Sequence, residues 1–232
     1  MNNLLWLIPV LPLLGFLLNG IANKRLSVNV SGWIASLSVL GSFIISVGLF
    51  SQLAADKNIV FQTEYFQWFK AGDFELNFGF LVDRLSVIML LVITGVGFLI
   101  HVYSIGYMHD EPDYPRYFSY LNLFVFFMLL LVLGSSYVLM FVGWEGVGLC
   151  SYLLIGFWFK NTSYNDAAKK AFIMNRIGDL GFLLGMFLIY QTFGSLHFDT
   201  VFSGAKTLMF DAPVLTAITL LLFVGAIGKS AQ

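Results

Sequence analysis

Residues 117–159 limit the possible fold of this sequence more than any other stretch, because they contain a single charged side chain, Glu145. The stretch has 43 residues, and one helix needs roughly 20 apolar residues to cross a membrane. Gly134, Ser135 and Ser136 interrupt it near the middle. The stretch therefore predicts two spanning helices joined by a tight turn. The second helix, within residues 142–159, would carry a carboxylate inside the bilayer, where a charge is costly.

The overall composition also indicates an integral membrane protein. The chain is 59% hydrophobic and 11% charged, whereas soluble domains have about 25% charged residues. Its net charge of −1 argues against a nucleic-acid partner. Cys150 is the only cysteine, so neither an internal disulfide nor a cysteine metal cluster is expected, and no metal site is predicted. We expect the lipid bilayer to be the main surroundings of this chain.

The hydrophobic segments predict an all-α polytopic membrane protein with about seven transmembrane helices. The predicted spans are residues 4–21, 28–53, 80–103, two within 117–159, 171–190, and one that starts near residue 213. Nothing in the last residues ends a helix, so we expect the protein to continue beyond Gln232.

The local structure of three connections between the spans can be predicted from their sequence patterns. Residues 74–80 alternate apolar and polar side chains after Ala71, Gly72 and Asp73, which predicts a small β-hairpin in the loop after the second helix. Residues 160–170 are polar and are predicted to form a loop. Residues 192–212 are predicted to include a short surface helix capped by Asp199.

Lysine and arginine residues are unevenly divided between the two sides of the predicted membrane. The loops after spans one, three and five hold six of them, and the other loops hold three: Lys24, Arg25, Arg116, Lys160, Lys169 and Lys170, against Lys57, Lys70 and Lys206. Cytoplasmic loops are enriched in these residues. The distribution predicts that the N-terminus lies outside the cytoplasm.

Ionisable side chains inside the predicted spans are the candidate functional residues, since such groups usually mark ion or proton pathways. They are Glu145, Arg176, Asp179 and Lys229. Arg176 and Asp179 are three residues apart and share one helix face. They could pair with each other or take part in a charge pathway. The glycines at 178, 181 and 185 are spaced for close packing of another helix.

Lys229 lies 16 residues beyond Pro213, which places it about 24 Å along the last helix. Gly225 and Gly228 precede it and predict a broken helix 7, as in transporters. A buried lysine needs an acidic partner, carbonyl groups or water. Glu145 is the first candidate partner and Asp179 the second.

A lysine–carboxylate pair inside a membrane can work as a switch. The nearby carboxylate favours the charged lysine, and its removal favours proton release. The alternative is a static ion pair that only fixes helix packing. His101, near the end of the third span, could be a proton-path residue or a plain hydrogen-bonding one. No nucleotide-binding motif, catalytic triad or iron–sulfur cysteine set is present, so this chain is not expected to carry a redox centre.

Several motifs resemble one known family. They are GWEGVGLCSYLLIGFW at residues 143–158, AFIMNRIGDLG at 171–181 and GAIGKSAQ at 225–232, with FGFLVDRLSVIM at 78–89 and HVYSIGYM at 101–108. Together they resemble the L-subunit (chain 5) family of respiratory complex I, NADH:quinone oxidoreductase. This is an antiporter-like family whose members continue well past residue 232. The resemblance covers essentially the whole chain.

The resemblance implies a proton-translocating membrane subunit. In it, Glu145 would modulate Lys229, with Asp179 and Arg176 in the same relay. Quinone reduction would occur elsewhere, so NADH, FMN, the iron–sulfur clusters and quinone would belong to other subunits. The implied partners are other antiporter-like membrane subunits, and the implied location is the bacterial inner membrane. Residues 1–110 would be an N-terminal antiporter-like region with helices 1–3 and the hairpin, and residues 111–232 would begin the proton-translocating core.

Two other functions fit the same residues. An Mrp-like cation/proton antiporter subunit would have this architecture without a redox link. A structural membrane scaffold would use its buried charges as static pairs.

Overall fold

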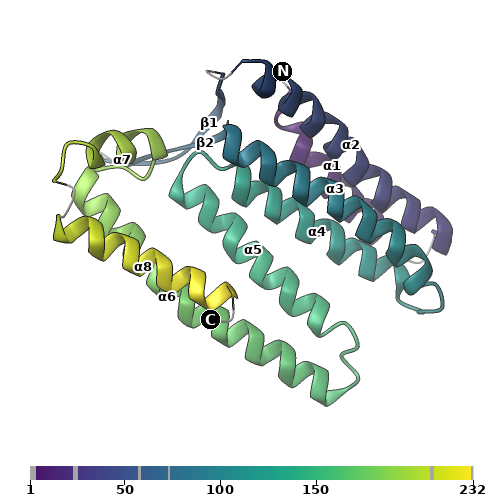
Figure 1. Cartoon of the computed structure of the whole chain (residues 1–232). Helices are drawn as coiled ribbons and strands as arrows, with labels where there is room; N and C mark the ends of the chain where they lie inside the picture. Colours follow the sequence, from purple (N-terminus) through teal and green to yellow (C-terminus); the bar gives the residue numbers. More distant parts are fainter. Residues whose placement is uncertain (1–3, 23–25, 57–58, 73, 210–211, 231) are drawn as a thin grey trace.

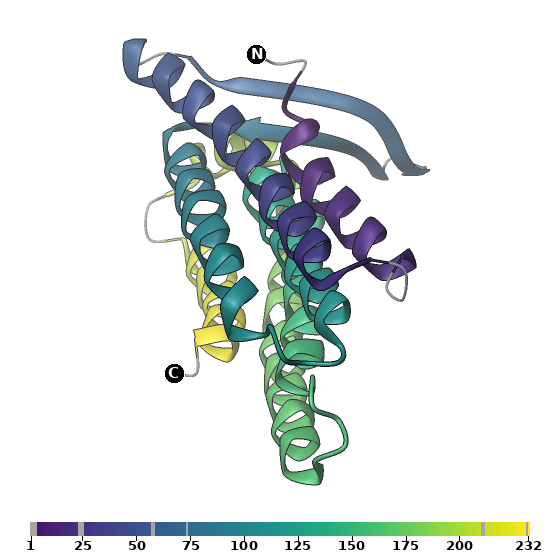
Figure 2. The same ribbon diagram turned by 90° about the vertical axis from the view of Figure 1, so that its right-hand side faces the viewer.

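A computed structural model describes residues 4–22, 26–56, 59–72, 74–209, 212–230 and 232. Its long helices run side by side, and a two-stranded hairpin lies across one end of them (Figure 1, Figure 2). In chain order the elements are α1 (Leu7–Ile21), α2 (Val28–Ala55), β1 (Phe61–Ala71), β2 (Phe74–Val82), α3 (Arg84–Tyr107), α4 (Tyr114–Leu133), α5 (Tyr137–Ile155), α6 (Thr162–Phe193), α7 (Phe198–Ala205) and α8 (Pro213–Ser230).

Six of the described helices are long and apolar enough to cross a membrane, namely α2, α3, α4, α5, α6 and α8. The predicted all-α polytopic membrane fold is therefore confirmed. α1 is also apolar, but it has only 15 residues. At about 1.5 Å per residue it is shorter than the roughly 30 Å hydrocarbon core. Residues 4–6, which were predicted to extend this span, form a turn instead.

The predicted β-hairpin after the second helix, α2, is confirmed. Strands β1 and β2 pair antiparallel, with Phe61 opposite Val82 at the open end. Gly72 lies in the turn with φ of +61°, a conformation that glycine adopts without steric strain. Asp73 of the predicted turn lies outside the described residues, as do Lys24, Arg25 and Lys57, which contributed to the predicted orientation.

The third span begins later than predicted. Phe80, its predicted first residue, belongs to β2 and pairs with Thr63. The helix α3 starts at Arg84, because Asp83 caps it: the Asp83 carboxylate accepts a hydrogen bond from the Ser86 backbone N–H at 2.8 Å, and the Ser86 hydroxyl lies 2.7 Å from the Asp83 N–H. This reciprocal arrangement is a capping box, which stabilises a helix start.

The predicted turn between the fourth and fifth spans is confirmed at residues 134–136. The Ser136 hydroxyl caps α5 by accepting a hydrogen bond from the Leu139 N–H. The backbone N–H and the hydroxyl of Ser135 both donate to the carbonyl oxygen of Gly79 in β2, at 3.1 and 2.9 Å. The turn is thus held by the hairpin.

The predicted polar loop at residues 160–170 is wrong, because α6 already begins at Thr162. Asn161 caps this helix by accepting a hydrogen bond from the Ser163 N–H at 3.0 Å. Asp166 and Lys169 then pair across one turn at 3.7 Å. The first turns of α6 are polar because they are exposed, and polarity alone does not distinguish an exposed helix from a loop.

The predicted short surface helix is present as α7, but Asp199 does not cap it. His197 occupies the N-cap position, and Asp199 lies in the first turn. The Asp199 carboxylate accepts a hydrogen bond from the side chain of Gln62 in β1 at 2.9 Å. This contact fixes α7 against the hairpin.

The predicted break in the last span is wrong within the described residues, since α8 is continuous from Pro213 to Ser230. Its glycines serve packing instead. A Cβ at Gly178 of α6 would lie 2.9 Å from the Cα of Gly228. A Cβ at Gly225 would lie 2.9 Å from the Cβ of Phe182. Gly181 and Gly185 similarly face α8, so the predicted packing role of the α6 glycines is confirmed.

The buried side chains form two main hydrophobic clusters. The first joins α1–α4 and the hairpin and also includes Leu139 of α5. The second lies among α5, α6, α7 and α8 and includes Phe182 and Ile189. α4 contacts α1, α2, α3 and α5, whereas α6 packs on α8 and α5. The predicted division of the chain at residue 110 stays a prediction.

We expect Gly178→Val, in the full-length protein, to destabilise the α6–α8 contact by about 1–3 kcal/mol, because the new side chain would collide with the backbone of α8. The measurement is the midpoint of thermal unfolding in detergent. Gly106→Val is the matched control, since a Cβ at Gly106 meets no described atom of another element within 4 Å. Equal midpoints for the two variants would contradict the packing described.

Candidate functional site

The four predicted site residues come together where α5, α6 and α8 meet. The α6–α8 glycine contact sets Lys229 beside the turn of α6 that carries Arg176 and Asp179. α5 faces the same place with Glu145. The electrostatic environment of Glu145 includes the other three charges, and that of Lys229 does as well. The site is therefore one cluster of two acids and two bases.

Arg176 is the ion-pair partner of Glu145. Its Nη1 contacts the Oε2 atom of the Glu145 carboxylate. The guanidinium also lies 4.9 Å from the ring centroid of Phe172, one turn earlier on α6. The predicted alternative of an Arg176–Asp179 pair is wrong, because Arg176 reaches across to α5 rather than along its own helix.

Asp179 accepts a hydrogen bond from the indole Nε1–H of Trp144, at 2.7 Å. Asp179 is 3% exposed, and a buried carboxylate needs a partner of this kind. A buried indole N–H needs an acceptor as well. This bond therefore satisfies both groups and joins α5 to α6 a second time.

Lys229 has no direct partner within the described residues. Its Nζ is buried and forms no hydrogen bond, and no ion pair joins it to Glu145 or Asp179. The predicted Glu145–Lys229 ion pair is thus absent from this arrangement. The amine lies 5.7 Å from the ring centroid of Trp144, within the range of a cation–π interaction. The Oε1 atom of Glu145 is also buried, and no described residue forms a hydrogen bond with it.

Two residues of the site were not recognised from the sequence. Trp144 contacts both Asp179 and Lys229. Its position next to Glu145 in the sequence could have identified it as a site residue. Gly148 makes room for the lysine, because a Cβ there would lie 2.7 Å from the Lys229 Nζ. Gly148 follows Trp144 by one helical turn, so the two residues share a face of α5.

A cavity of about 740 Å³ adjoins the lysine. It lies among α5, α6 and α8, and its wall includes Lys229, Asn175 and Ser151. Lys170, near the exposed start of α6, also lines it. The cavity therefore runs between the buried amine and the polar end of α6.

His101 is not part of this cluster. It is fully buried on α3, and its Nδ1–H donates to the Gly97 carbonyl oxygen at 2.7 Å. Its ring lies 6.1 Å from that of Phe118 on α4, and its Nε2 has no partner among the described residues. The structure describes no group of three His, Cys, Asp or Glu side chains that could hold a metal ion.

The described residues thus contain six membrane-length helices and a cluster of four charges where α5, α6 and α8 meet, which are features of a polytopic membrane protein. Comparisons with known proteins identify which type. Residues 68–118 match the family model for the chain 5 N-terminus of NADH-ubiquinone oxidoreductase (complex I). Residues 134–232 match the transmembrane model shared by NADH:quinone oxidoreductase and Mrp antiporters. The chain belongs to this antiporter-like family, and the resemblance seen in the sequence motifs is confirmed.

Individual relatives agree with this result. NADH-quinone oxidoreductase subunit L of Mycobacterium tuberculosis H37Rv is 46% identical over 98% of this chain and 36% of the relative. Subunit L of Pseudomonas aeruginosa PAO1 is 44% identical over 99% and 38%. NADH-ubiquinone oxidoreductase chain 5 of Allomyces macrogynus is 45% identical over 96% and 34%. The chain thus spans about a third of the length of these relatives.

Two solved structures share the fold. A chain of the Mrp complex from Dietzia sp. DQ12-45-1b superposes with a TM-score of 0.80 at 23% identity, covering 98% of this chain and 24% of that one. A chain of the archaeal membrane-bound sulfane sulfur reductase also gives 0.80, at 19% identity, covering 97% and 44%. The helical arrangement is therefore common to membrane complexes of different activity.

We expect Arg176→Met in the full-length protein to lower the free energy of unfolding by about 1–3 kcal/mol, because the Glu145 carboxylate would lose its partner. A fully buried pair would lose 3–5 kcal/mol, but half of the Arg176 side chain is exposed. The measurement is a double-mutant cycle of denaturant unfolding with Glu145→Gln, which should recover most of the loss. Additive effects of the two substitutions would contradict the pairing.

Proposed function

We propose that this chain is the N-terminal part of a proton-translocating membrane subunit of NADH:quinone oxidoreductase. The main support is the amine of Lys229, which has no partner in the described parts of the chain and lies beside two carboxylates and in the wall of a cavity. A buried amine without a fixed partner is free to gain and lose a proton, whereas a static ion pair would hold it charged.

The geometry suggests a role in proton transfer for each charged residue of the cluster. A proton that enters along the cavity would reach the Lys229 amine. Glu145 would hold that proton electrostatically while its own pairing with Arg176 is loosened. When Arg176 again pairs with Glu145, the carboxylate would attract the lysine less, and the proton would leave. Because the groups interact, they would titrate as one unit.

Trp144 and Asp179 have a supporting role in this proposal. The indole N–H bond holds the Asp179 carboxylate in place, and the face of the same ring lies near the Lys229 amine. The ring would therefore keep the amine close to the carboxylates without neutralising it. Gly148 leaves the space that the amine occupies.

The wider context follows from the relatives. NADH, FMN, iron–sulfur clusters and quinone would be bound by other subunits, and their redox reaction would drive the proton movement. Neighbouring antiporter-like membrane subunits would be the direct partners. The protein would lie in the bacterial inner membrane with its N-terminus on the outer side, as the lysine and arginine distribution indicates.

An Mrp-like cation/proton antiporter would use the same architecture, and the shared family model and the Mrp fold keep this function as the second candidate. The higher identity to subunit L relatives favours the redox-linked function. A scaffold with static pairs is disfavoured by the lysine, which is not in a pair within the described residues.

We expect Lys229→Met and Glu145→Gln, each in the assembled full-length complex, to reduce NADH-driven proton pumping by about tenfold or more, since each removes a proton-binding group or its control. Pumping is measured in sealed vesicles together with NADH-dependent quinone reduction. Lys169→Gln is the control, because this lysine is exposed on the surface of α6 and pairs only with Asp166 among the described residues.

Normal pumping by both variants in assembled complexes would overturn the relay. Loss of assembly with normal pumping per assembled complex would favour the scaffold. Proton movement that responds to a Na⁺ gradient but not to NADH would favour the Mrp-like antiporter.

We expect Gly148→Ala to impair pumping severalfold while changing the stability by no more than about 1 kcal/mol. The methyl group would displace only the flexible end of Lys229, and alanine favours a helix over glycine. The readouts are pumping and thermal unfolding of the same preparation. Gly106→Ala is the matched control, and equal pumping by the two variants would show that the amine position is unimportant.

A further inference from the structure

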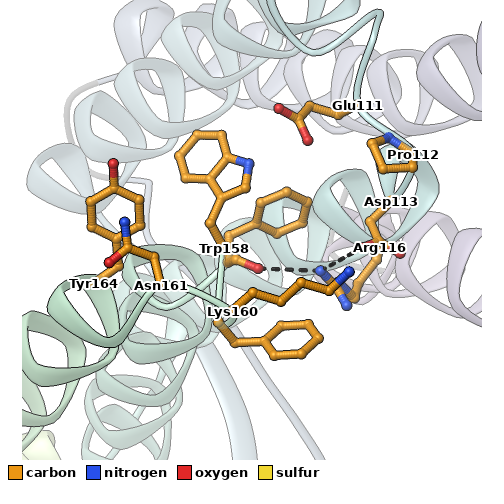
Figure 3. A pocket seen from close by; sticks show the side chains of 10 residues that line it. Glu111, Pro112, Asp113, Arg116, Trp158, Lys160, Asn161 and Tyr164 are labelled. Carbon is orange, nitrogen blue, oxygen red and sulfur yellow. Dashed lines mark hydrogen bonds and ion pairs between the residues drawn. The ribbon is translucent and has the colours of Figure 1, made fainter.

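Figure 3 shows a second cavity, of about 420 Å³. Its lining connections lie at the end of the helices opposite the hairpin (Figure 1). It is bordered by the connection between α3 and α4 and by the connection between α5 and α6. Its wall combines aromatic and charged side chains: Glu111, Pro112, Asp113, Arg116, Phe157, Trp158, Phe159, Lys160, Asn161 and Tyr164. The charge cluster of the proposed proton site does not contribute to it.

Arg116 is held rigidly in this cavity. Its guanidinium lies 4.8 Å from the ring centroid of Phe157 and 5.0 Å from that of Phe159. It donates a hydrogen bond to the Phe157 carbonyl oxygen at 3.2 Å and pairs with Asp113 at 3.0 Å. Its Nε atom is buried and has no partner in the described part of the chain. The guanidinium is thus preorganised and not fully satisfied.

Two further charges of opposite sign line the cavity without a described ion-pair partner. They are the ammonium of Lys160 and the carboxylate of Glu111. With Arg116 and Asp113, the wall therefore carries two positive and two negative groups. Such a wall does not favour a simple anion, because the acids would repel it. It complements a ligand that carries both signs.

The place of the cavity in the fold indicates what that ligand is. The cavity lies where spanning helices end, and Trp and Tyr side chains there are typical of the membrane–water interface. Trp158 is 42% exposed and Phe159 is 53% exposed, so they present apolar surface at that level. The abundant molecules with both charges at this depth are zwitterionic phospholipids. The volume also lies within the range of small-ligand sites.

We propose that this cavity binds the headgroup of a phospholipid with a phosphoethanolamine head. The phosphate would bind Arg116 and Lys160, which offer N–H donors. The primary ammonium would donate to the Glu111 carboxylate and lie near the Trp158 ring. A choline head has no N–H to donate to Glu111, and a glycerol head has no positive charge. The inference does not depend on the proton-transfer role of Lys229.

The test is photocrosslinking of the full-length protein in its assembled complex. The complex is reconstituted in nanodiscs with a diazirine-tagged phosphatidylethanolamine, and crosslinked peptides are mapped by mass spectrometry. We expect labels near the cavity to fall by about three- to tenfold in Lys160→Gln and in Glu111→Gln, the effect of losing one hydrogen bond of ordinary net strength. Lys169→Gln, which removes an exposed lysine outside the cavity, should label as the unmodified protein does.

Matched phosphatidylcholine and phosphatidylglycerol probes complete the experiment, and both should label the cavity less than the ethanolamine probe. Equal labelling by all three headgroups, or labelling that neither variant reduces, would show a nonspecific lipid surface and overturn the proposal. Absence of labelling in the unmodified protein would mean that another subunit covers the cavity, and it would overturn the proposal as well.

Discussion

The ion pair between Glu145 and Arg176 joins α5 to α6 within the apolar bundle. A carboxylate in such surroundings is unstable unless it is paired or neutral. The pair forms in the same interface in which Asp179 accepts the hydrogen bond of the Trp144 indole N–H. Two polar contacts therefore join α5 to α6 at the level of the charge cluster.

The glycine contact between α6 and α8 places the second base of the site. Gly178 and Gly228 let the two backbones come close, which brings Lys229 to the level of Trp144 and Gly148. Because Arg176 already pairs with Glu145, the lysine is left without an ion pair among the described residues. The cluster therefore contains one base in an ion pair and one base without an ion pair in the described part of the chain.

The two ends of the helices differ in structure. At one end the hairpin holds the turn between α4 and α5 through Ser135 and holds α7 through Asp199. At the other end, aromatic rings and charges around Arg116 leave an open cavity. The first end is closed by backbone and side-chain hydrogen bonds. The second presents the mixed polar and apolar surface that suits a membrane interface.

The sequence by itself determined the membrane class, the hairpin, the turn at residues 134–136 and the presence of four charges within the apolar segments. Each follows from local properties, namely apolar length, alternation, turn residues and charge within an apolar segment. The tertiary structure decided which charges pair, because spacing along one helix says nothing about how neighbouring helices are rotated. It also decided that Gly225 and Gly228 pack rather than break α8, since a glycine serves either purpose until a neighbouring backbone lies against it.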